Sequence, residues 1–178
     1  MKKIIVSACL CVCSIITNAQ SIGSFLDFYL GQSMSEVRSI INSKYYSSEW
    51  NGNVCKIFNV SLAGEQFNQL TIEFSGGQII SATFLNSPDH IITFSSSDFN
   101  QRMESQINIQ QQRIARLYAQ YKSKYGKETA SSDTSVIWTD LSGKSINLFV
   151  TINNNHSYDS YMGNVNVIVK YSTRQGNF

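Results

Sequence analysis

The sequence has 178 residues, of which 42% are hydrophobic and only 15% charged, with 14 basic and 12 acidic side chains. A chain of this length and composition forms one ordinary domain with a core of its own. The near-neutral charge argues against a nucleic-acid-binding protein, which carries a basic excess. Beyond the N-terminal segment no stretch has the roughly 20 apolar residues that a transmembrane helix needs.

The N-terminus has the three parts of a secretory signal peptide. Lys2 and Lys3 precede an apolar run over residues 4–16, and the small residues Thr17 and Ala19 stand before a cleavage site. The pattern predicts cleavage after Ala19 and a periplasmic or secreted protein. Cleavage removes two of the 14 basic residues and leaves 12 against 12 acidic ones.

The cysteines bear on both export and stability. Val6-Ser7-Ala8-Cys9 resembles a lipobox, which makes a lipoprotein the alternative, but only the apolar residues 4–6 precede it. Cys9, Cys11 and Cys13 lie in the predicted signal peptide. The mature chain keeps Cys55 alone, so we expect its stability to come from burial rather than from a disulfide.

The first half of the mature chain predicts a helix followed by an antiparallel meander. Ser33-Met34-Ser35-Glu36 has the form of a capping box, and apolar residues at helical spacing follow it, which predicts a helix over 34–44. Gly76 and Gly77 tolerate the positive φ of a tight hairpin turn. The strands predicted here from β-forming and alternating residues cover 54–62, 67–74 and 79–85.

The second half predicts the same order of elements. After a loop over 86–98, an amphipathic helix is expected from about Asp98 to Tyr125, with Gly126 as its C-terminal cap. Gln110 interrupts its apolar arc. The strands predicted after it cover 134–139, 145–152 and 164–171, with a polar loop over 153–161.

These patterns predict an α+β fold. Ser-Lys-Tyr recurs near the end of each helix, at 43–45 and 123–125, and matching element order at one period indicates an internal repeat. We predict a single domain over 20–178 with pseudo-repeat halves of about 20–95 and 96–178. Each half is a helix-plus-three-strand meander, and together they form a six-stranded antiparallel sheet with two helices packed on one face.

One segment resembles a known group of proteins. Tyr29-Leu30-Gly31-Gln32-Ser33-Met34-Ser35-Glu36-Val37 is similar to the helix opening of small exported helix-meander modules. This group includes beta-lactamase inhibitor protein and the small lipoprotein of the outer-membrane assembly machine. The resemblance implies a protein that binds other proteins and catalyses nothing. The mature chain lacks the disulfides of the former, and residues 6–9 lack the preceding apolar stretch of a working lipobox such as that of the latter, so neither partner is transferred.

Candidate catalytic groups are few. His90 and His156 are the only histidines, and no metal-ligand spacing surrounds them, so we predict neither metal nor cofactor. Cys55 is a candidate nucleophile with a histidine as base, yet its place in a predicted strand indicates a small buried hydrophobe. Carboxylates such as Glu65 and Asp140 fall at predicted turns. The alternative to a binding module is therefore an exported hydrolase that uses Cys55 or scattered carboxylates.

Two sets of side chains are candidates for a binding surface. Basic residues fall within about 80° beside the apolar arc of the second helix, and such a stripe suits an anionic surface or is an ordinary solvated face. Loop aromatics anchor interfaces or cap a core. The basic set is Arg102, Arg113, Arg116, Lys124 and Lys127, and the aromatic set is Tyr45, Tyr46, Trp50, Tyr158 and Tyr161.

We therefore expect a noncatalytic, exported protein-binding or envelope-associated module, without a nucleic-acid partner and without a transmembrane segment. An envelope component that works as an oligomer is a third hypothesis.

Overall fold

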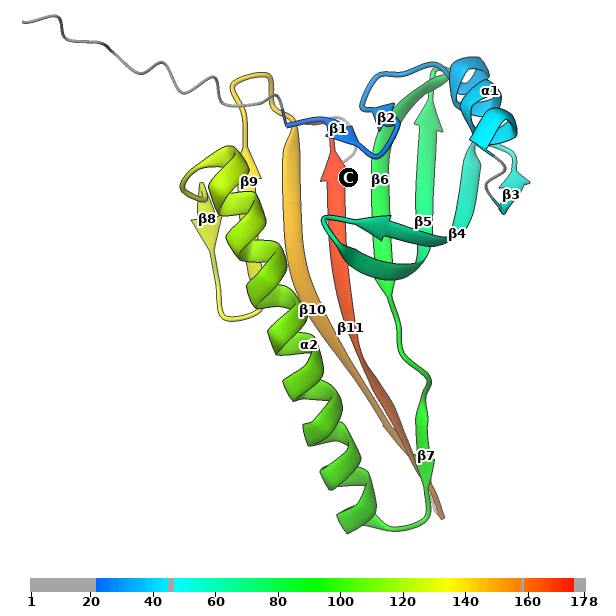
Figure 1. The fold of residues 1–178 in the computed structure, drawn as a ribbon. Helices are drawn as coiled ribbons and strands as arrows, with labels where there is room; N and C mark the ends of the chain where they lie inside the picture. Colours follow the sequence, from blue (N-terminus) through cyan, green and yellow to red (C-terminus); the bar gives the residue numbers. More distant parts are fainter. Residues whose placement is uncertain (1–21, 45–46, 158, 175–178) are drawn as a thin grey trace, which may run out of the picture.

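The computed structural model describes residues 22–44, 47–157 and 159–174, and these form a large antiparallel sheet with two helices (Figure 1). The arrangement confirms the predicted α+β class. The helices are α1 (Met34–Lys44) and α2 (Ser96–Tyr125). The strands are β1 (Ser24–Phe25), β2 (Phe28–Tyr29), β3 (Ser48–Asn51), β4 (Val54–Leu62), β5 (Glu65–Ser75), β6 (Gln78–Asn86), β7 (Ile91–Thr93), β8 (Ala130–Ser131), β9 (Ser135–Thr139), β10 (Ser145–His156) and β11 (Tyr161–Ser172).

The main sheet joins the two predicted meanders through their last strands. Its order is β3-β4-β5-β6-β11-β10-β9-β8, and β7 pairs with the far end of β11. In the centre Asn86 of β6 lies opposite Val167 of β11, and Ser81 lies opposite Ser172. The sheet has nine strands rather than the expected six, because the short strands β3, β7 and β8 extend it.

The hairpin β10–β11 is longer than its sequence pattern predicts. The expected polar loop over 153–161 is wrong, since pairing continues without a register shift to His156 opposite Tyr161. The asparagine run at 153–155 has no apolar alternation, so backbone pairing with β11 rather than hydrophobic patterning determines its conformation. The predicted loop over 86–98 likewise contains β7, which pairs with residues 161–163.

Both helices contribute to one continuous apolar cluster. Val37 and Ile41 of α1 and Leu117 and Tyr121 of α2 are buried in it together with the inner side chains of β4, β5, β6, β10 and β11. The Tyr121 and Tyr171 hydroxyls are 3.0 Å apart, and burial raises the pKa of both groups. In the described part of the chain neither helix combines the length and apolar character needed to cross a bilayer.

Local capping fixes the helix ends. The Ser33 amide donates to a Glu36 carboxylate oxygen at 3.1 Å and the Glu36 amide donates to Ser33 Oγ at 3.3 Å, which confirms the capping box. Hydrogen bonds from Ser33 lower the pKa of Glu36. The second helix begins earlier than predicted, because Ser95 is its N-cap. It ends at Gly126, whose φ of 79° suits glycine.

The hairpin β4–β5 bends back over the core face toward α2 (Figure 1). Asn59 has a φ of 55°, and no pair is formed between Asn59 and Asn68. At this point the buried positions shift by one residue in both strands, from Cys55 and Ile57 to Val60 and Leu62 in β4. The bend carries the hairpin tip to α2, where Gln120 Nε2 donates to the Ala63 carbonyl at 2.8 Å.

The N-terminal half of α2 leaves the body of the molecule as part of an arm. The arm comprises β7 and residues 96–107, 150–156 and 161–165 (Figure 1). It has its own apolar cluster of Ile91, Phe99, Met103 and Val165. A helix of 30 residues is about 45 Å long, and the arm results because the body covers only part of that length.

The arm depends on Gly163. A Cβ at this position would lie 2.6 Å from the Asn153 carbonyl oxygen and 3.1 Å from the Phe99 ring. We expect Gly163→Ala to lower the free energy of unfolding by about 1–3 kcal/mol, because a backbone atom cannot yield to the added methyl. Urea denaturation measures this change.

Gly23→Ala is the matched control. The three atoms nearest to its Cβ all belong to the flexible end of the Lys144 side chain, the first at 3.0 Å, so a much smaller loss is expected. An equal loss in the two variants would contradict the tight packing assigned to Gly163.

Candidate functional site

A groove of about 390 Å³ lies between α2 and the sheet, where the arm joins the body. It forms because α2 packs on β11 and β7 while β10 stays less covered. Its α2 wall is Ile107, Gln110, Gln111, Ile114, Ala115 and Tyr118; its floor is Leu148, Phe149, Val150, Ile152 and Val165; and its opposite wall is residues 132–136.

The groove is lined largely by apolar side chains. Ile114 projects from α2, Val150 and Ile152 come from β10, and Ile152 is 53% exposed. Among the described residues that line it, Asp133 is the one carboxylate. The site therefore offers dispersion contacts and apolar burial to a ligand, with little charge to recognise.

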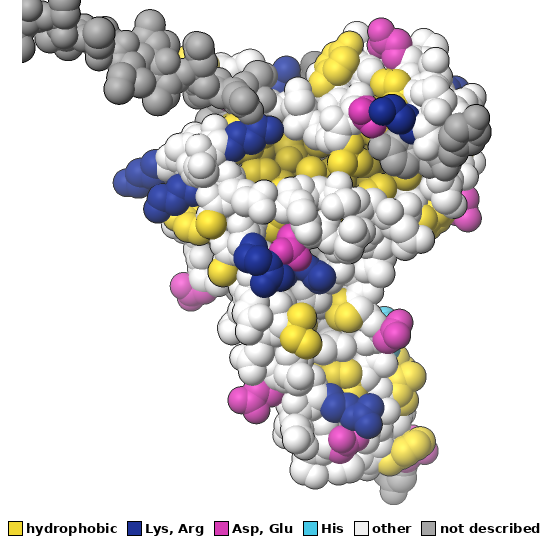
Figure 2. Space-filling view, in the orientation of Figure 1, with side chains coloured by type: hydrophobic (Ala, Val, Ile, Leu, Met, Phe, Trp, Pro, Cys, Tyr) yellow, Lys and Arg dark blue, Asp and Glu magenta, His cyan; other side chains and the backbone are white. Residues whose placement is uncertain are grey.

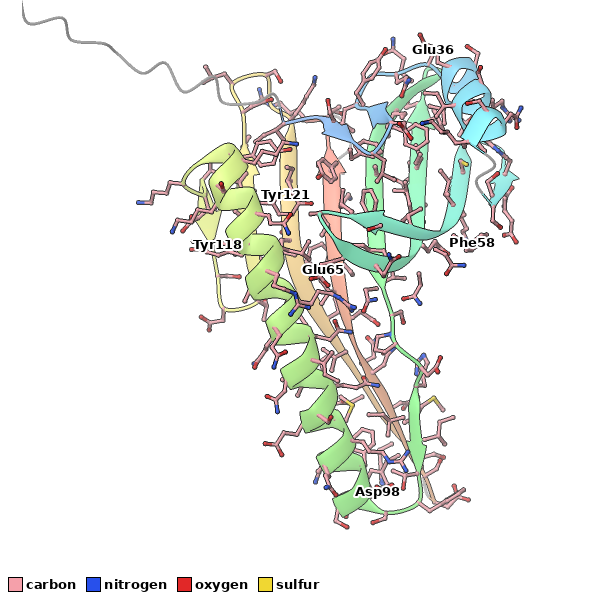
Figure 3. All side chains as sticks on the ribbon, in the orientation of Figure 1. Glu36, Phe58, Glu65, Asp98, Tyr118 and Tyr121 are labelled. Atoms are coloured by element: carbon pink, nitrogen blue, oxygen red, sulfur yellow. The ribbon has the colours of Figure 1, made fainter. Side chains whose placement is uncertain are left out.

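A cluster of polar side chains at mid-helix holds α2 against the bent hairpin. Glu65 at the hairpin tip accepts from Arg113 Nε at 3.1 Å and from Arg116 Nε at 2.5 Å (Figure 3). Arg113 also donates to the side-chain oxygens of Asn86 and Gln110. We call these five residues the latch; Figure 2 shows basic and acidic side chains together at this height of the molecule.

The latch explains the polar interruption in the apolar arc of α2. Gln110, which interrupts the apolar arc of α2, is only 3% exposed and donates to Asn86 Oδ1 at 2.8 Å. Asn86 in turn donates to the Gln66 carbonyl at 3.1 Å. The interruption is thus the point at which the main cluster ends and the arm cluster begins, and each buried amide there has a hydrogen-bond partner.

The charge of Glu65 is stabilised by its partners. Its side chain is 11% exposed, and the hydrogen bond from Arg116 lowers the pKa of Glu65, with a further contribution from Arg113. A carboxyl whose pKa is lowered on folding stabilises the fold above its ordinary pKa of 4.5, and that contribution is lost as the pH falls through the lowered value.

Four of the five basic residues predicted as a binding stripe contact other side chains of the described chain. Arg113 and Arg116 belong to the latch. Arg102 pairs with Asp98 at 3.1 Å, and the Lys124 ammonium lies 5.0 Å from the centre of the Tyr125 ring. Lys127 is exposed beyond the helix end. The two central arginines of the stripe therefore bind Glu65 at the hairpin tip.

The predicted aromatic residues lie at two separate places. Trp50 on β3 stacks on Phe74 with 5.8 Å between ring centres, and the Arg38 guanidinium lies 3.9 Å from the Trp50 ring centre. Tyr161 packs on Phe99 in the arm. Tyr45, Tyr46 and Tyr158 lie outside the described residues.

The thiol of the alternative hydrolase is buried. Cys55 has no exposed surface, and burial raises the pKa of its thiol to about 11. His90 and His156 are both exposed. Among the described residues no three His, Cys, Asp or Glu side chains are grouped to hold a metal ion.

Sequence reasoning missed the groove and the role of Glu65. The sequence places Glu65 beside a turn, but it gives no sign that the hairpin bends back onto a helix roughly 50 positions later in the chain. The interruption of the apolar arc by Gln110 is the one sequence signal that points to this region. Ile152 was expected at the end of a strand, with no sign that it borders a groove.

A search of protein-family models, of curated proteins and of solved structures found no match to this chain.

Replacing the latch carboxylate tests its role. We expect Glu65→Gln to lower the free energy of unfolding at pH 7 by about 1–2 kcal/mol, because the charge-assisted hydrogen bonds to the arginines weaken. The difference from wild type should shrink as the pH falls below 4.5, because Glu65 is protonated first in the unfolded chain and then, at lower pH, in the folded protein. Urea denaturation at pH 7 and pH 3 measures both effects.

Glu104→Gln is the control, since Glu104 is an exposed carboxylate on α2, the helix that carries Arg113 and Arg116. A stability difference for Glu65→Gln that stays the same at both pH values would contradict the electrostatic role of Glu65.

The accessibility of Cys55 is tested by alkylation. Because the buried thiol stays protonated at neutral pH, we expect iodoacetamide to leave the folded protein unmodified at pH 7.5 and to label it rapidly in urea. Mass spectrometry reads the added mass, and labelling of the folded chain as fast as in urea would restore Cys55 as a candidate nucleophile.

Proposed function

We propose that the protein is a noncatalytic exported module that binds a protein ligand in the groove between α2 and β10. The observation that carries the proposal is the apolar groove itself, with Ile152 on its floor more than half exposed. Burying such side chains against a ligand contributes about 25 cal/mol for each Å² of apolar surface removed from water.

The groove is held in its shape by contacts on both sides. The latch fixes α2 at mid-length, and the Tyr121 and Tyr171 hydroxyls join it to the sheet further along. The Trp138 indole N–H donates to the Gly126 carbonyl at 3.1 Å and fixes the helix end. A site that is already formed binds with a smaller entropic cost than one that must be ordered by its ligand.

The burial of Cys55 supports the noncatalytic part of the proposal over the hydrolase. A thiol with a pKa near 11 is protonated at neutral pH, whereas a nucleophilic cysteine needs a lowered pKa and access to substrate. The N-terminal pattern of charged, apolar and small residues supports export, with a periplasmic or secreted location.

The charges favour an apolar protein segment over an anionic surface as ligand. Arg113 and Arg116 already hold Glu65, so the middle of α2 carries little free positive charge. The resemblance of residues 29–37 to exported protein-binding modules supports the same reading. The ligand is therefore expected to present apolar side chains to the groove.

Filling the groove tests the proposal. The mature protein is used to select ligands from a random peptide-display library, and affinities are measured for wild type, Ala115→Phe and Ala119→Phe. Ala115 lines the groove, whereas Ala119 is exposed one helical turn later and does not. We expect Ala115→Phe to weaken binding at least about tenfold, because the ring occupies ligand space.

Ala119→Phe should leave the affinity unchanged, since its ring lies outside the groove. Selected peptides that bind all three proteins equally, or a selection that yields no ligand, would contradict the proposed function.

A further inference from the structure

We propose that the ligand binds as an extended strand that adds to the free edge of β10. This inference rests on the proposed function and specifies the class of ligand: a polypeptide segment in β conformation with apolar side chains at alternate positions.

The free edge begins where β9 stops. The last pair between the two strands is Phe149 with Ser135, and the next contact is a hydrogen bond from the Val150 amide to the Thr134 carbonyl, at 3.1 Å. Beyond it, β10 continues for six more residues, to His156, with β11 on one side only. In the described part of the chain no strand pairs with the other side of residues 151–156.

The direction of the backbone groups follows from strand geometry. The N–H and C=O groups of one residue in an antiparallel ladder point to the same side, and the side alternates along the chain. Since the Val150 amide points to the β9 side, the backbone groups of Ile152, Asn154 and His156 point to the free edge. The register of β10 against β11 is continuous here, so no bulge reverses this alternation.

A second hydrogen bond confirms the alternation. Val165 lies opposite Ile152, so its amide points away from β10. That amide donates to Gln106 Oε1 of α2 at 3.2 Å, in the gap between β6 and β7. The hydrogen bonds of both strands therefore indicate that the backbone groups of Ile152 and Val165 point away from the β10–β11 ladder.

This edge lacks the features that keep strand edges from pairing. Exposed edges are usually short, or carry lysine, proline or a bulge. The outermost strands are short: β3 has four residues, β8 has two and β7 has three. The outer edge of β4 beyond β3 is interrupted by the bend at Asn59. The free edge of β10 is longer, has neither charged residue nor proline between Val150 and Asn155, and is exposed from Ile152 to His156.

The groove explains which side chains an added strand needs. Val150 and Ile152 point to the face that α2 covers, as Leu148 does, and they form the groove floor. Neighbouring side chains on paired strands lie about 5 Å apart on one face. A strand beside β10 therefore places every second side chain in the groove, against Ile107 and Ile152, and the others beside Thr151 and Asn153.

The space favours a single peptide over a second copy of this chain. The groove is walled by α2 on one side and by residues 132–136 on the other. A lone extended segment enters between these walls. The β10 strand of a second copy carries its own β11 and α2, which would have to enter with it.

The experiment combines a variant that removes a backbone amide with a measurement of amide exchange along the free edge of β10. The probe is a library of nine-residue peptides in which Val, Ile, Leu or Phe alternates with Thr. Peptides selected from it are measured against wild type, Ile152→Pro and Ile152→Val. Amide exchange of Ile152 and Asn154 is followed by NMR with and without peptide, and selected peptides are also made with N-methylated core amides.

We expect Ile152→Pro to weaken binding at least about tenfold, since it removes an outward-facing amide that is not part of the β10–β11 ladder. Ile152→Val keeps that amide and should bind nearly as wild type. Peptide should slow exchange of the Ile152 and Asn154 amides, and N-methylation should abolish binding. The slowed exchange in wild type keeps the test valid if Ile152→Pro fails to fold.

Peptides that lose affinity for Ala115→Phe but leave both amides unprotected would overturn strand addition and leave the proposed function standing. Amides already protected without peptide, in a protein that elutes as a dimer, would overturn it in favour of a second copy. Failure to select any groove-dependent peptide from either library would overturn the proposed function and this inference together.

Discussion

The ion pairs of Glu65 with Arg113 and Arg116 hold the middle of α2 against the bent β4–β5 hairpin. A carboxylate that is only 11% exposed would strongly destabilise the fold without such partners. The bend at Asn59 brings the hairpin tip to the middle of α2, and the latch holds it there. The C-terminal half of α2 packs in the main core and the N-terminal half packs in the arm. The groove lies where the main core and the arm meet.

The sequence predicted the regular elements well because their signals are local. The capping box and spacing placed α1 at residues 34–44, and alternation placed β4, β5, β6 and β11 to within about three residues at each end. The sequence-based prediction failed where pairing with a distant strand determines the conformation, as in the asparagine run of β10 and in β7. The candidate site was missed for the same reason. Ile114 and Ile152 meet at the groove, and Glu65 reaches Arg113 and Arg116, only through tertiary packing.

Function in this account follows from incomplete coverage of the sheet. Because α2 packs on β11 and β7, the far half of β10 has an apolar face beside a groove. Because β9 pairs with β10 only as far as Phe149, the same half has an edge without a strand partner in the described chain. The two features occur on the same few residues, and each needs what an extended apolar peptide supplies. An envelope component that works as an oligomer needs a second copy to cover the same edge.

The most direct test of the groove as the binding site is chemical-shift mapping of the ¹⁵N-labelled chain from residue 20 onward with a selected peptide. The account predicts that the largest amide shifts fall on Ile107, Ile114, Val150 and Ile152, on both sides of the groove. Shifts confined to the opposite face of the sheet, at Thr71, Thr83 and Lys170, with none along α2, would contradict it.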